Sequence, residues 1–452
     1  MNKNDIIKLK ITSMTAQGSG IGKSENGIVI FVPFSAIGDE LEVRILKVKK
    51  TYAYGKIERI LNPSPDRIEP DCKNFGKCGG CVYRHISYNS EKEIKRQRVI
   101  DAVERIGGLK DVKINKVVEN DCINRYRNKA QLPCQNTENG IEFGFYANHS
   151  HRIIPCSDCL LQPEAFNKVM KITKDFMNNT AQSAYDERTG KGKLRHLYIR
   201  YAEMTDELMV CYVVNGNGLK RENELLEQLK NELPNLKSVV FNSNTENTNV
   251  ITGLKNRTAY GRGYIEDILC SKKFRISPLS FYQVNRSQAE KLYTTAKNYA
   301  DLNGNETLLD LYCGTGTIGL TMADNCKELI GVEIIEDAVK DAEINAQING
   351  INNTRFICAD AASAAKKLKE EKIKPDVIIA DPPRKGLDNS VIETIAEMRP
   401  EKVVYISCDP ETLARDLKLF TDENYSIKGI TPVDMFSRTS HVENVALLIS
   451  DV

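Results

Sequence analysis

Residues 402–417 read KVVYISCDPETLARDL, and this stretch, where an apolar run stops at a cysteine and a helix begins, decides the C-terminal fold. An apolar run such as 403–406 is typical of a buried parallel strand. Open α/β sheets bind their ligands beyond the carboxyl ends of such strands. We therefore expect Cys408 at a strand tip, beside a helix N-terminus whose dipole favours a thiolate. The alternative, a buried structural cysteine, is the commoner role of this residue type.

Strands and helices alternate on the N-terminal side of this stretch. The tail differs, because the strand-like segments 426–434 and 441–449 have no helix between them. The sequence thus predicts an α/β, Rossmann-like domain over residues 271–452 whose parallel, doubly wound sheet ends in a hairpin. The apolar runs that predict the parallel strands are 307–312, 329–334, 355–359, 376–380 and 403–406.

The N-terminal residues 1–61 show a different pattern, in which short apolar runs are separated by glycines. Many short strands at such spacing predict a small antiparallel barrel. Within it, the segment 44–59 interleaves six Lys and Arg residues with Tyr52 and Tyr54. Cations for phosphates and aromatic rings for bases are typical of nucleic-acid binding. A charged edge strand, protected from aggregation by lysines, explains this segment equally well.

Composition limits the class of protein. A chain of 452 residues suggests roughly two to four domains, and we expect an α+β region over 62–270 between the barrel and the C-terminal domain. The N-terminus lacks the apolar core of a signal peptide, and no run approaches the roughly 20 apolar residues of a membrane span. Thirteen cysteines, an odd number, then favour a cytoplasmic protein that uses thiols for metal binding or chemistry. The net charge of +2 means that any nucleic-acid surface must be local, and a monomer is the default expectation.

Three cysteines are clustered at residues 72–81, with the spacing Cys72-x5-Cys78-x2-Cys81. The two glycines before Cys81 allow the backbone to wrap closely around a bound group. A tetrahedral thiolate set needs a fourth ligand, and Cys156 and Cys159 are the nearest clustered candidates. The spacing is compatible with zinc and with an iron–sulfur cluster.

The segment 308–320, LLDLYCGTGTIGL, combines a strand, a glycine turn and a helix start. Its G-x-G-x-x-G pattern matches the dinucleotide fingerprint, and Glu333 at the end of the next strand suits a ribose diol. NAD and S-adenosylmethionine both fit these features. Asp310 before the turn and the bulky Tyr312 favour S-adenosylmethionine.

The segment 381–387, DPPRKGL, follows the fourth parallel strand. Its tandem prolines fix the backbone and present Asp381 and Arg384 at the ligand edge of the sheet. Enzymes that methylate amino groups usually end the comparable segment with an aromatic residue that stacks on the target base. The arginine in its place argues against an amino group as the target.

The motifs together resemble the tRNA/rRNA uracil-5-methyltransferase family. SFYQVN, DLYCGTG, DPPRKGL, SCDPETLARDL and HVENV follow in that order, with CKNFGKCGGC upstream, and QGSGIG and AIGDELEV in the barrel resemble the TRAM module. The resemblance implies an S-adenosylmethionine-dependent class I fold that methylates uracil C5 in RNA. Members with both a TRAM barrel and a [4Fe–4S] cluster mostly act on 23S ribosomal RNA, so the resemblance favours rRNA over tRNA.

The same resemblance implies a role for individual residues. The Cys408 thiolate would add to uracil C6, C5 would take the methyl group, and Glu443 would remove the C5 proton. The apolar neighbours of Glu443 are expected to raise its pKa into a useful range. The target base would be unpaired or flipped into the pocket. The other residues implied are Gln283, Tyr312, Thr317, Glu333, Asp360 and Asp381 for the methyl donor, and Cys72, Cys78, Cys81 and Cys159 for the cluster.

Two readings from other classes compete with this one. An iron–sulfur oxidoreductase that uses NAD accounts for the cysteines and the glycine turn, but it leaves Cys408, the DPPR segment and the barrel without a role. A non-catalytic RNA-binding protein with a relic fold would have no need of both Cys408 and Glu443. A tRNA uracil-C5 methyltransferase remains the alternative within the family.

Overall fold

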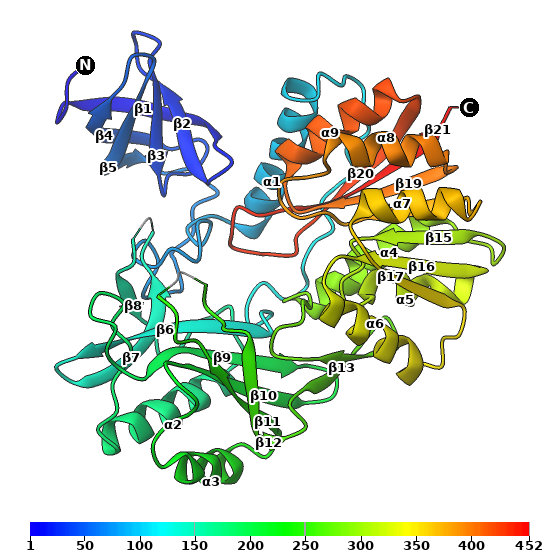
Figure 1. Cartoon of the computed structure of the whole chain (residues 1–452). Helices are drawn as coiled ribbons and strands as arrows, with labels where there is room; N and C mark the ends of the chain where they lie inside the picture. Colours follow the sequence, from blue (N-terminus) through cyan, green and yellow to red (C-terminus); the bar gives the residue numbers. More distant parts are fainter. Residues whose placement is uncertain (149, 248–249, 452) are drawn as a thin grey trace.

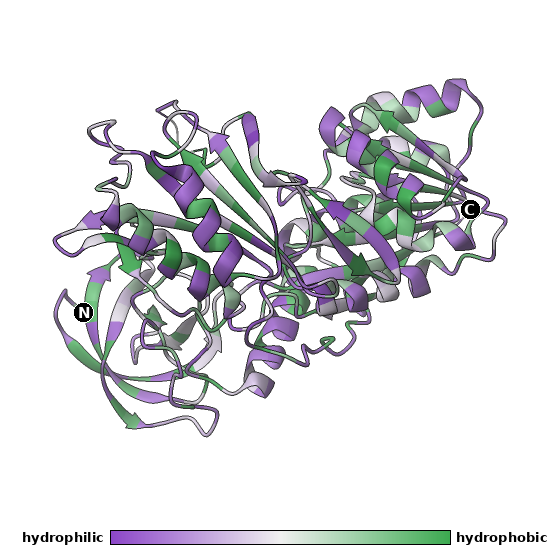
Figure 2. Ribbon diagram, turned by 90° about the horizontal axis from the view of Figure 1, so that it is seen from below, coloured by the Kyte–Doolittle hydropathy of each residue, from purple (hydrophilic) through white to green (hydrophobic). Residues whose placement is uncertain are grey.

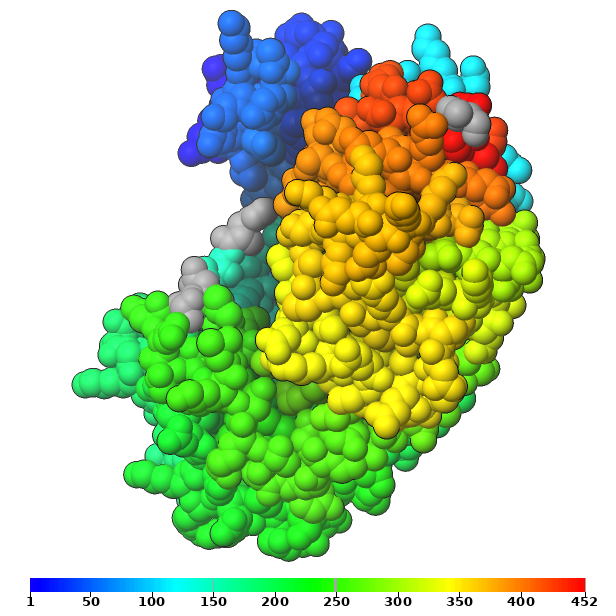
Figure 3. Space-filling view, turned by 45° about the vertical axis from the view of Figure 1, so that its right-hand side comes forward, coloured from blue at the N-terminus to red at the C-terminus, as the bar shows by residue number. Residues whose placement is uncertain are grey.

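The computed structural model describes residues 1–148, 150–247 and 250–451. A small barrel, a central sheet and a C-terminal sheet follow one another along the chain (Figure 1). In the space-filling view the barrel and the C-terminal domain form separate lobes above the central domain (Figure 3). The predicted fold class, a Rossmann-like C-terminal sheet with an N-terminal barrel and an α+β central part, is confirmed.

The N-terminal strands form a closed barrel in the order β1-β2-β3-β5-β4. Alternate residues of the fourth strand, Leu41, Val43 and Ile45, point into its core. The second strand was not predicted, because Gly20 and Gly22 interrupt its apolar pattern. A Cβ at Gly22 would lie 2.6 Å from the Lys10 carbonyl oxygen, so glycine is needed for the close approach of the first two strands. The strands are β1 (Ile6–Met14), β2 (Ser19–Lys23), β3 (Val29–Pro33), β4 (Glu40–Val48) and β5 (Tyr52–Asn62).

The central domain contains a seven-stranded sheet in the order β12-β11-β10-β9-β6-β7-β8. Two helices, α2 (Ala165–Asn179) and α3 (Glu222–Glu232), cover one face and share an apolar core with it (Figure 1). The other face is partly polar and turns towards the rest of the molecule. The strands are β6 (Lys129–Thr137), β7 (Gly140–Tyr146), β8 (Ile153–Pro155), β9 (Leu194–Ala202), β10 (Glu207–Val214), β11 (Leu236–Ser243) and β12 (Lys255–Gly261).

The C-terminal sheet has the strand order β17-β16-β15-β18-β19-β21-β20. The first five of these strands are parallel, and β21 is antiparallel to both of its neighbours. The predicted terminal hairpin is therefore present, with its last strand inserted next to β19. The strands are β15 (Thr307–Leu311), β16 (Glu328–Glu333), β17 (Thr354–Cys358), β18 (Val377–Ala380), β19 (Lys402–Ser407), β20 (Tyr425–Val433) and β21 (Glu443–Ser450).

Helices cover both faces of this sheet, which explains the unbroken apolar runs of its strands. In β19, Val404 and Ile406 belong to one core, while Val403 and Tyr405 belong to the core on the opposite face. Figure 2 shows apolar strands between helices with polar outer surfaces. The helices of this domain are α4 (Arg286–Ala300), α5 (Thr317–Met322), the short η1 (Ala323–Asn325), α6 (Glu336–Ile348), α7 (Ala361–Glu370), α8 (Asn389–Met398) and α9 (Pro410–Asp422).

Two elements connect the domains. Helix α1 (Tyr88–Arg105) precedes the central sheet in the chain but packs against α9 of the C-terminal domain. The hairpin of β13 (Ile265–Leu269) and β14 (Lys272–Ile276) contacts the central sheet with one strand and α6 with the other. None of the helices that the structure describes combines the length and the apolarity that crossing a membrane requires.

Candidate active site

Cys408 and Glu443 lie at the ends of two neighbouring strands. β19 ends at Ser407 and β21 begins at Glu443, and the antiparallel ladder between them pairs Ser407 with Asn444. Continued by one position beyond its last pair, this register sets Cys408 opposite Glu443, and Glu443 raises the pKa of the Cys408 thiol as a nearby carboxyl group does. The Asn444 side-chain amide donates a hydrogen bond to the Ser407 carbonyl oxygen at 3.3 Å. The two predicted site residues are thus brought together although 35 positions separate them in the chain.

Helix α9 begins directly after Cys408. The Asp409 carboxylate accepts hydrogen bonds from the backbone N–H groups of Glu411 and Thr412, at 3.1 and 3.0 Å, and caps the helix. Pro410 occupies the first turn, where its missing N–H is not needed. The strand end and the capped helix start therefore hold Cys408 from both sides.

The pKa values of the two groups are shifted in the same direction. Burial raises the pKa of Cys408 to about 11, and Glu443 and Asp381 add to the rise. Burial also raises the pKa of Glu443, which is 5% exposed, to about 8. The expected rise at Glu443 is confirmed. The expectation of a thiolate at Cys408 is not met, because burial and three nearby carboxyl groups, those of Glu443, Asp381 and Asp409, raise its pKa.

Asp381 and Arg384 have opposite effects on the pKa values of Cys408 and Glu443. Burial raises the pKa of Asp381 to about 7. The exposed Arg384 lowers the pKa of both Cys408 and Glu443, because a nearby cation favours their anionic forms. The DPPR segment therefore places a carboxyl group and a guanidinium beside the cysteine, as its position after β18 predicted.

The glycine turn lies two strands away, at the same edge of the sheet. The Glu333 carboxylate accepts hydrogen bonds from the backbone N–H of Gly314, at 3.1 Å, and from that of Ile335, at 2.9 Å. One oxygen of Asp310 accepts from the Gly319 N–H at 2.8 Å, whereas its other buried oxygen has no hydrogen-bond partner in the described part of the chain. The turn therefore has a carboxyl group on each side, which suits a ligand that carries ribose hydroxyls and a positive charge.

Tyr312 joins the turn to the DPPR segment. Its backbone has a φ of 65°, a left-handed conformation that is rare for an aromatic residue and is found at sites of function. Because β15 pairs Leu311 with Ala380 of β18, Tyr312 and Asp381 are the next residues along the two strands. The half-buried ring packs against the apolar core that α7, α8 and α9 form with the sheet.

The remaining predicted donor-site residues lie around this edge. Thr317 starts α5, and its hydroxyl forms a 3.2 Å hydrogen bond with the Tyr293 hydroxyl of α4. Asp360 follows β17 and caps α7, accepting from the Ser363 N–H at 3.0 Å. Gln283 is buried just before α4. Asp360 is therefore at the far end of the row of strand tips, and Gln283 approaches from the opposite side.

Three exposed apolar residues at this edge were missed from the sequence. Ile334 and Ile335 follow Glu333 and are 66% and 60% exposed, and Phe281 is 60% exposed beside Gln283. Large apolar side chains in such positions suit the flat faces of a purine or pyrimidine. The sequence did contain a signal for two of them, because Ile334 and Ile335 stand at the junction of a predicted strand and the polar start of a predicted helix.

One cavity of about 260 Å³ is surrounded by the four cysteines predicted to bind a metal group, Cys72, Cys78, Cys81 and Cys159. Burial raises the pKa of Cys78 to about 11, and the neighbouring thiols of Cys81, Cys159 and Cys72 contribute to the rise. Cys156 also lines the cavity, and the neighbouring Cys159 lowers its pKa. Among the described residues, no three Cys, His, Asp or Glu side chains converge as closely as one metal ion requires. An all-thiol set around a roomy cavity fits a polynuclear cluster better than a single zinc ion.

The protein places one buried cation against these thiols. Arg84 is 2% exposed and lowers the pKa of Cys81, as a nearby cation does. Its guanidinium also donates to Asp71, at 2.6 Å, and to the Asn124 side-chain oxygen, at 3.1 Å. A guanidinium in this position offsets part of the negative charge that deprotonated thiols would bring into the cavity.

Comparison with known proteins places this geometry in a family. Residues 111–451 match the family described as tRNA (Uracil-5-)-methyltransferase, and residues 2–57 match the TRAM domain. The chain belongs to the tRNA (uracil-5-)-methyltransferase family. Its activity is the S-adenosylmethionine-dependent methylation of uracil C5 in RNA.

Relatives support this assignment over nearly the whole chain. An uncharacterized RNA methyltransferase of Clostridium tetani (strain Massachusetts / E88) is 43% identical over 99% of this chain and 97% of that protein. One from Staphylococcus aureus (strain MRSA252) is 42% identical over 98% of both. The crystal structure of Pyrococcus abyssi tRNA (uracil-54, C5)-methyltransferase with S-adenosyl-L-homocysteine has a TM-score of 0.78 and 28% identity, covering 98% of this chain and 99% of that one.

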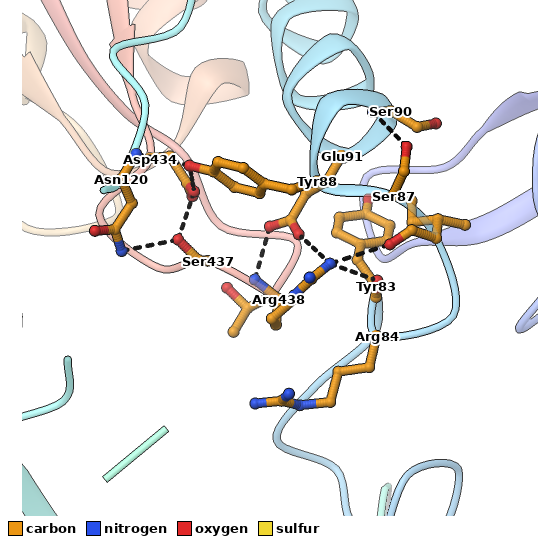
Figure 4. A network of polar contacts seen from close by, with 12 residues as sticks. Tyr83, Arg84, Ser87, Tyr88, Ser90, Glu91, Asn120, Asp434, Ser437 and Arg438 are labelled. Carbon is orange, nitrogen blue, oxygen red and sulfur yellow. Dashed lines mark hydrogen bonds and ion pairs between the residues drawn. The ribbon is translucent and has the colours of Figure 1, made fainter. Parts of the chain in front are cut away.

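In this methyltransferase a buried ionic network holds the loop that leads to Glu443, residues 434–442 (Figure 4). The Lys95 ammonium lies 2.7 Å from Glu91 and 2.6 Å from Asp434. The backbone N–H of Arg438 donates to Glu91 at 2.7 Å, and the Tyr88 hydroxyl donates to Asp434 at 2.7 Å. Helix α1 therefore fixes the 434–442 loop through paired charges.

The same loop is tied to the cysteine-rich segment. The Arg438 carbonyl oxygen accepts hydrogen bonds from the N–H groups of Val82, at 2.9 Å, and Tyr83, at 3.2 Å, which directly follow Cys81. The Arg438 guanidinium donates to the Ile86 carbonyl oxygen at 3.0 Å. The segment that carries the cysteines and the loop that carries Glu443 are thus one hydrogen-bonded unit.

The barrel of the methyltransferase pairs the arginines of segment 44–59 with carboxylates. Arg44 forms two hydrogen bonds with Glu58, at 2.8 and 2.7 Å, and Arg59 forms two with Glu42, at 3.2 and 3.0 Å. Beside them an aromatic cluster on β3 and β5 has ring centroids 5.5–5.7 Å apart, and it consists of Phe31, Tyr52 and Tyr54. Both arginines are thus paired with a carboxylate, and the side chain of Arg44 is 32% exposed while that of Arg59 is 67% exposed.

Proposed function

We propose that this enzyme methylates uridine by a covalent route in which Cys408 is the nucleophile and Glu443 the base. The observation that carries the proposal is the β19–β21 register, which sets the two side chains opposite each other at one strand edge. Methylation at an unactivated pyrimidine carbon needs a nucleophile on C6 and a base for the C5 proton. A thiol facing a carboxyl group supplies both.

The proposed steps conserve atoms and electrons. The Cys408 thiolate, which has lost its proton to solvent, forms a bond with C6 through its sulfur, and the C5–C6 π electrons move onto the C4 carbonyl oxygen as an enolate. C5 then attacks the methyl carbon of the donor, whose bond to sulfur breaks and leaves S-adenosylhomocysteine. The Glu443 carboxylate takes the C5 proton, the C5–C6 double bond forms again, and the Cys408 thiolate leaves. Arg384, which lowers the pKa of both groups, favours their reactive anionic forms.

We propose that the glycine turn and the strand tips around it hold the methyl donor. Glu333 would accept from the ribose hydroxyls, while Asp360 with Ile334 and Ile335 would contact the adenine side. Asp310, with its unpartnered oxygen, would face the cationic methionine end. Further residues proposed to line the donor and reaction pocket are Gln283, Tyr312, Thr317 and Asp381.

The test of the mechanism is methyl transfer from labelled S-adenosylmethionine to RNA. Cys408→Ala should abolish transfer, and Glu443→Gln should accumulate a protein–RNA adduct that survives denaturation, because the C5 proton stays in place. Cys326→Ala is the matched control, since this buried cysteine precedes β16 at the opposite edge of the sheet. Full transfer by Cys408→Ala, or the absence of an adduct with Glu443→Gln, would contradict the assignment.

We propose that a [4Fe–4S] cluster is bound by Cys72, Cys78, Cys81 and Cys159. The shared cavity supports this set, as does the rise that Cys72 and Cys159 add to the pKa of both Cys78 and Cys81. When bound, the cluster would supply a rigid link between two loops of the central domain. Anaerobically purified protein should contain iron and absorb broadly in the visible range. Cys159→Ser should remove both signals, and Cys156→Ser should retain them; zinc without iron would refute the cluster.

We propose 23S ribosomal RNA as the substrate, because a TRAM barrel and four suitable cysteines occur together in one chain. Transfer RNA is the second candidate, since the P. abyssi enzyme matches the whole chain and is a tRNA methyltransferase. Mapping 5-methyluridine in rRNA and tRNA from a strain that lacks the gene decides between them. We further propose residues 1–61 and 62–270 as an RNA-binding barrel and a cluster-bearing domain, and 271–452 as the catalytic domain of a monomer.

A further inference from the structure

Two cations of the central domain lie on the wall of the cysteine cavity. Arg127, Lys129 and Gln131 are half-buried and alternate with the buried Asn128 and Ala130, so the three polar side chains share one side of the chain as it enters β6. All three line the cavity of about 260 Å³. The alternation places a basic surface at a spot where these three side chains stay partly accessible to solvent.

These cations have no carboxylate to balance them. The β6–β9 ladder pairs Lys129 with Arg200. The Arg200 guanidinium donates to the Tyr198 hydroxyl, at 2.8 Å, and to the Ser280 carbonyl oxygen. Burial, together with Arg200 and Arg127, lowers the pKa of Lys129 to about 8, and no acidic group opposes this shift. Within the described residues, three neighbouring cations thus repel one another without a counter-charge, which is an arrangement that an anionic ligand stabilises.

Arg84 is the cation that lowers the pKa of Cys81 and of Cys159. Between Arg127 and Lys129, the Asn128 side-chain amide donates a hydrogen bond to the Gln283 carbonyl oxygen at 3.0 Å, and the Asn128 backbone N–H donates to that of Val284 at 2.8 Å. The two cations therefore flank a residue that is bonded to the segment carrying Gln283, as well as lining the cysteine cavity.

Arg127 is also close to the loop that leads to Glu443. The Arg127 guanidinium lies 5.9 Å from the centre of the Phe436 ring, and that ring lies 6.0 Å from His441. His441 is two residues before Glu443, and the Ser280 that Arg200 contacts is three residues before Gln283. The cations therefore lie between the two loops that frame the catalytic edge.

We propose that Arg127 and Lys129, backed by Arg200, bind a phosphodiester of the RNA strand next to the target uridine. Phosphate contacts of this kind fix the register of a nucleic acid without reading its sequence. Here they would hold the strand while the adjacent base enters the site beside Cys408. The inference rests on the proposed position of the target uridine.

The test measures binding of fluorescently labelled oligouridylate to the full-length, cluster-containing protein over a range of salt concentrations, without S-adenosylmethionine. Lys129→Ala and Arg127→Ala should each weaken binding about tenfold and lower the slope of log K against log[salt] by about 1. Lys129→Arg should restore both values. Lys171→Ala, an exposed lysine of α2 on the opposite face of the central sheet, should leave them unchanged.

Unchanged affinity and salt slope in Lys129→Ala and Arg127→Ala would overturn the proposal. Loss of iron and visible absorbance with unaltered RNA binding would also overturn it, because the cations would then serve the cluster. The outcome is independent of the catalytic assignment. If the wild-type protein binds RNA through these residues but Cys408→Ala still transfers methyl groups, the covalent mechanism fails and the phosphate site stands.

Discussion

At the scale of single residues, neighbouring groups shift the pKa values of the candidate active site in opposite directions. Burial raises the pKa of Cys408 to about 11 and that of Glu443 to about 8, and Arg384 works against both shifts. At neutral pH Glu443 is therefore protonated in most molecules, and in the proposed mechanism it must lose that proton before it can accept the one on C5. Residue chemistry alone thus predicts how the activity depends on pH.

We expect kcat/KM to rise with pH through about 8, where Glu443 becomes a base, and to continue rising towards about 11, where the Cys408 thiol becomes a thiolate. Arg384→Met should move the inflection to higher pH, since it removes the cation that lowers the pKa. Lys385→Met, which removes a neighbouring exposed cation that pairs with Asp388, is the control. A profile that is already flat from pH 5 upwards, or one that Arg384→Met leaves in place, would contradict this assignment.

At the scale of elements, α1 and the 434–442 loop are joined by charges that lie out of contact with water. Lys95 is the partner of both Glu91 and Asp434, and all three side chains are fully buried. Removal of the cation would leave two carboxylates uncompensated. The loop that ends at Glu443 therefore depends on a helix that lies far away in sequence.

Lys95→Met should lower the free energy of unfolding by about 3–5 kcal/mol, the usual cost of breaking a buried ion pair from one side. Lys92→Met on the same helix should cost about 1 kcal/mol or less, because the Glu119 partner of Lys92 is largely exposed. Denaturant titration of both variants measures the difference. Equal losses of stability in the two variants would show that the buried ion pairs of Lys95 do not stabilise the fold more than the more exposed pair of Lys92.

A second prediction at this scale concerns β5 of the barrel. Tyr54→Ala should weaken RNA binding about tenfold, because it removes a stacking surface from the aromatic cluster. Arg44→Ala should have a smaller effect, since the Arg44 guanidinium is engaged by Glu58. Titration of labelled RNA at fixed salt compares the two variants. A larger effect of Arg44→Ala would show that the ion pair opens to bind phosphate.

At the scale of the whole molecule, the cysteine-rich segment touches each part of the protein. It packs under the barrel, where Tyr83 and Ile86 share a small core with Ala36. It also contacts the central sheet, because the Gly79 N–H donates to the Tyr146 carbonyl oxygen at 3.0 Å. Through Arg438 it reaches the catalytic domain (Figure 4). The proposed cluster therefore lies at the point where the domains meet.

Removal of the cluster by chelation under oxidising conditions should increase hydrogen exchange in residues 72–86 and 156–162, where the ligands lie. The effect should extend to the 434–442 loop, since Val82 and Tyr83 donate hydrogen bonds to Arg438. Exchange measured by mass spectrometry tests this, with the apolar core strands β9 to β11 as the internal reference. Protection of the 434–442 loop that is unchanged by cluster loss would refute the coupling.

Much of the fold follows from the sequence, because local patterns report local burial. Runs such as 403–406 predict strands covered on both faces, and the glycine turn after β15 predicts where a donor binds. The order of the motifs likewise indicates the family and places Cys408 at a strand end. Each of these features depends on residues that are close together in the chain.

Only the tertiary structure decides which distant groups meet. Insertion of β21 beside β19 sets Glu443 opposite Cys408, and a hairpin in the other order would have separated them. The pairing of Arg44 with Glu58 and the raised pKa of Cys408 also arise from contacts across strands. The periodicity of a segment predicts which of its residues are buried. It carries no information about which distant segment packs beside it, and that packing decides which charges and which strands become neighbours.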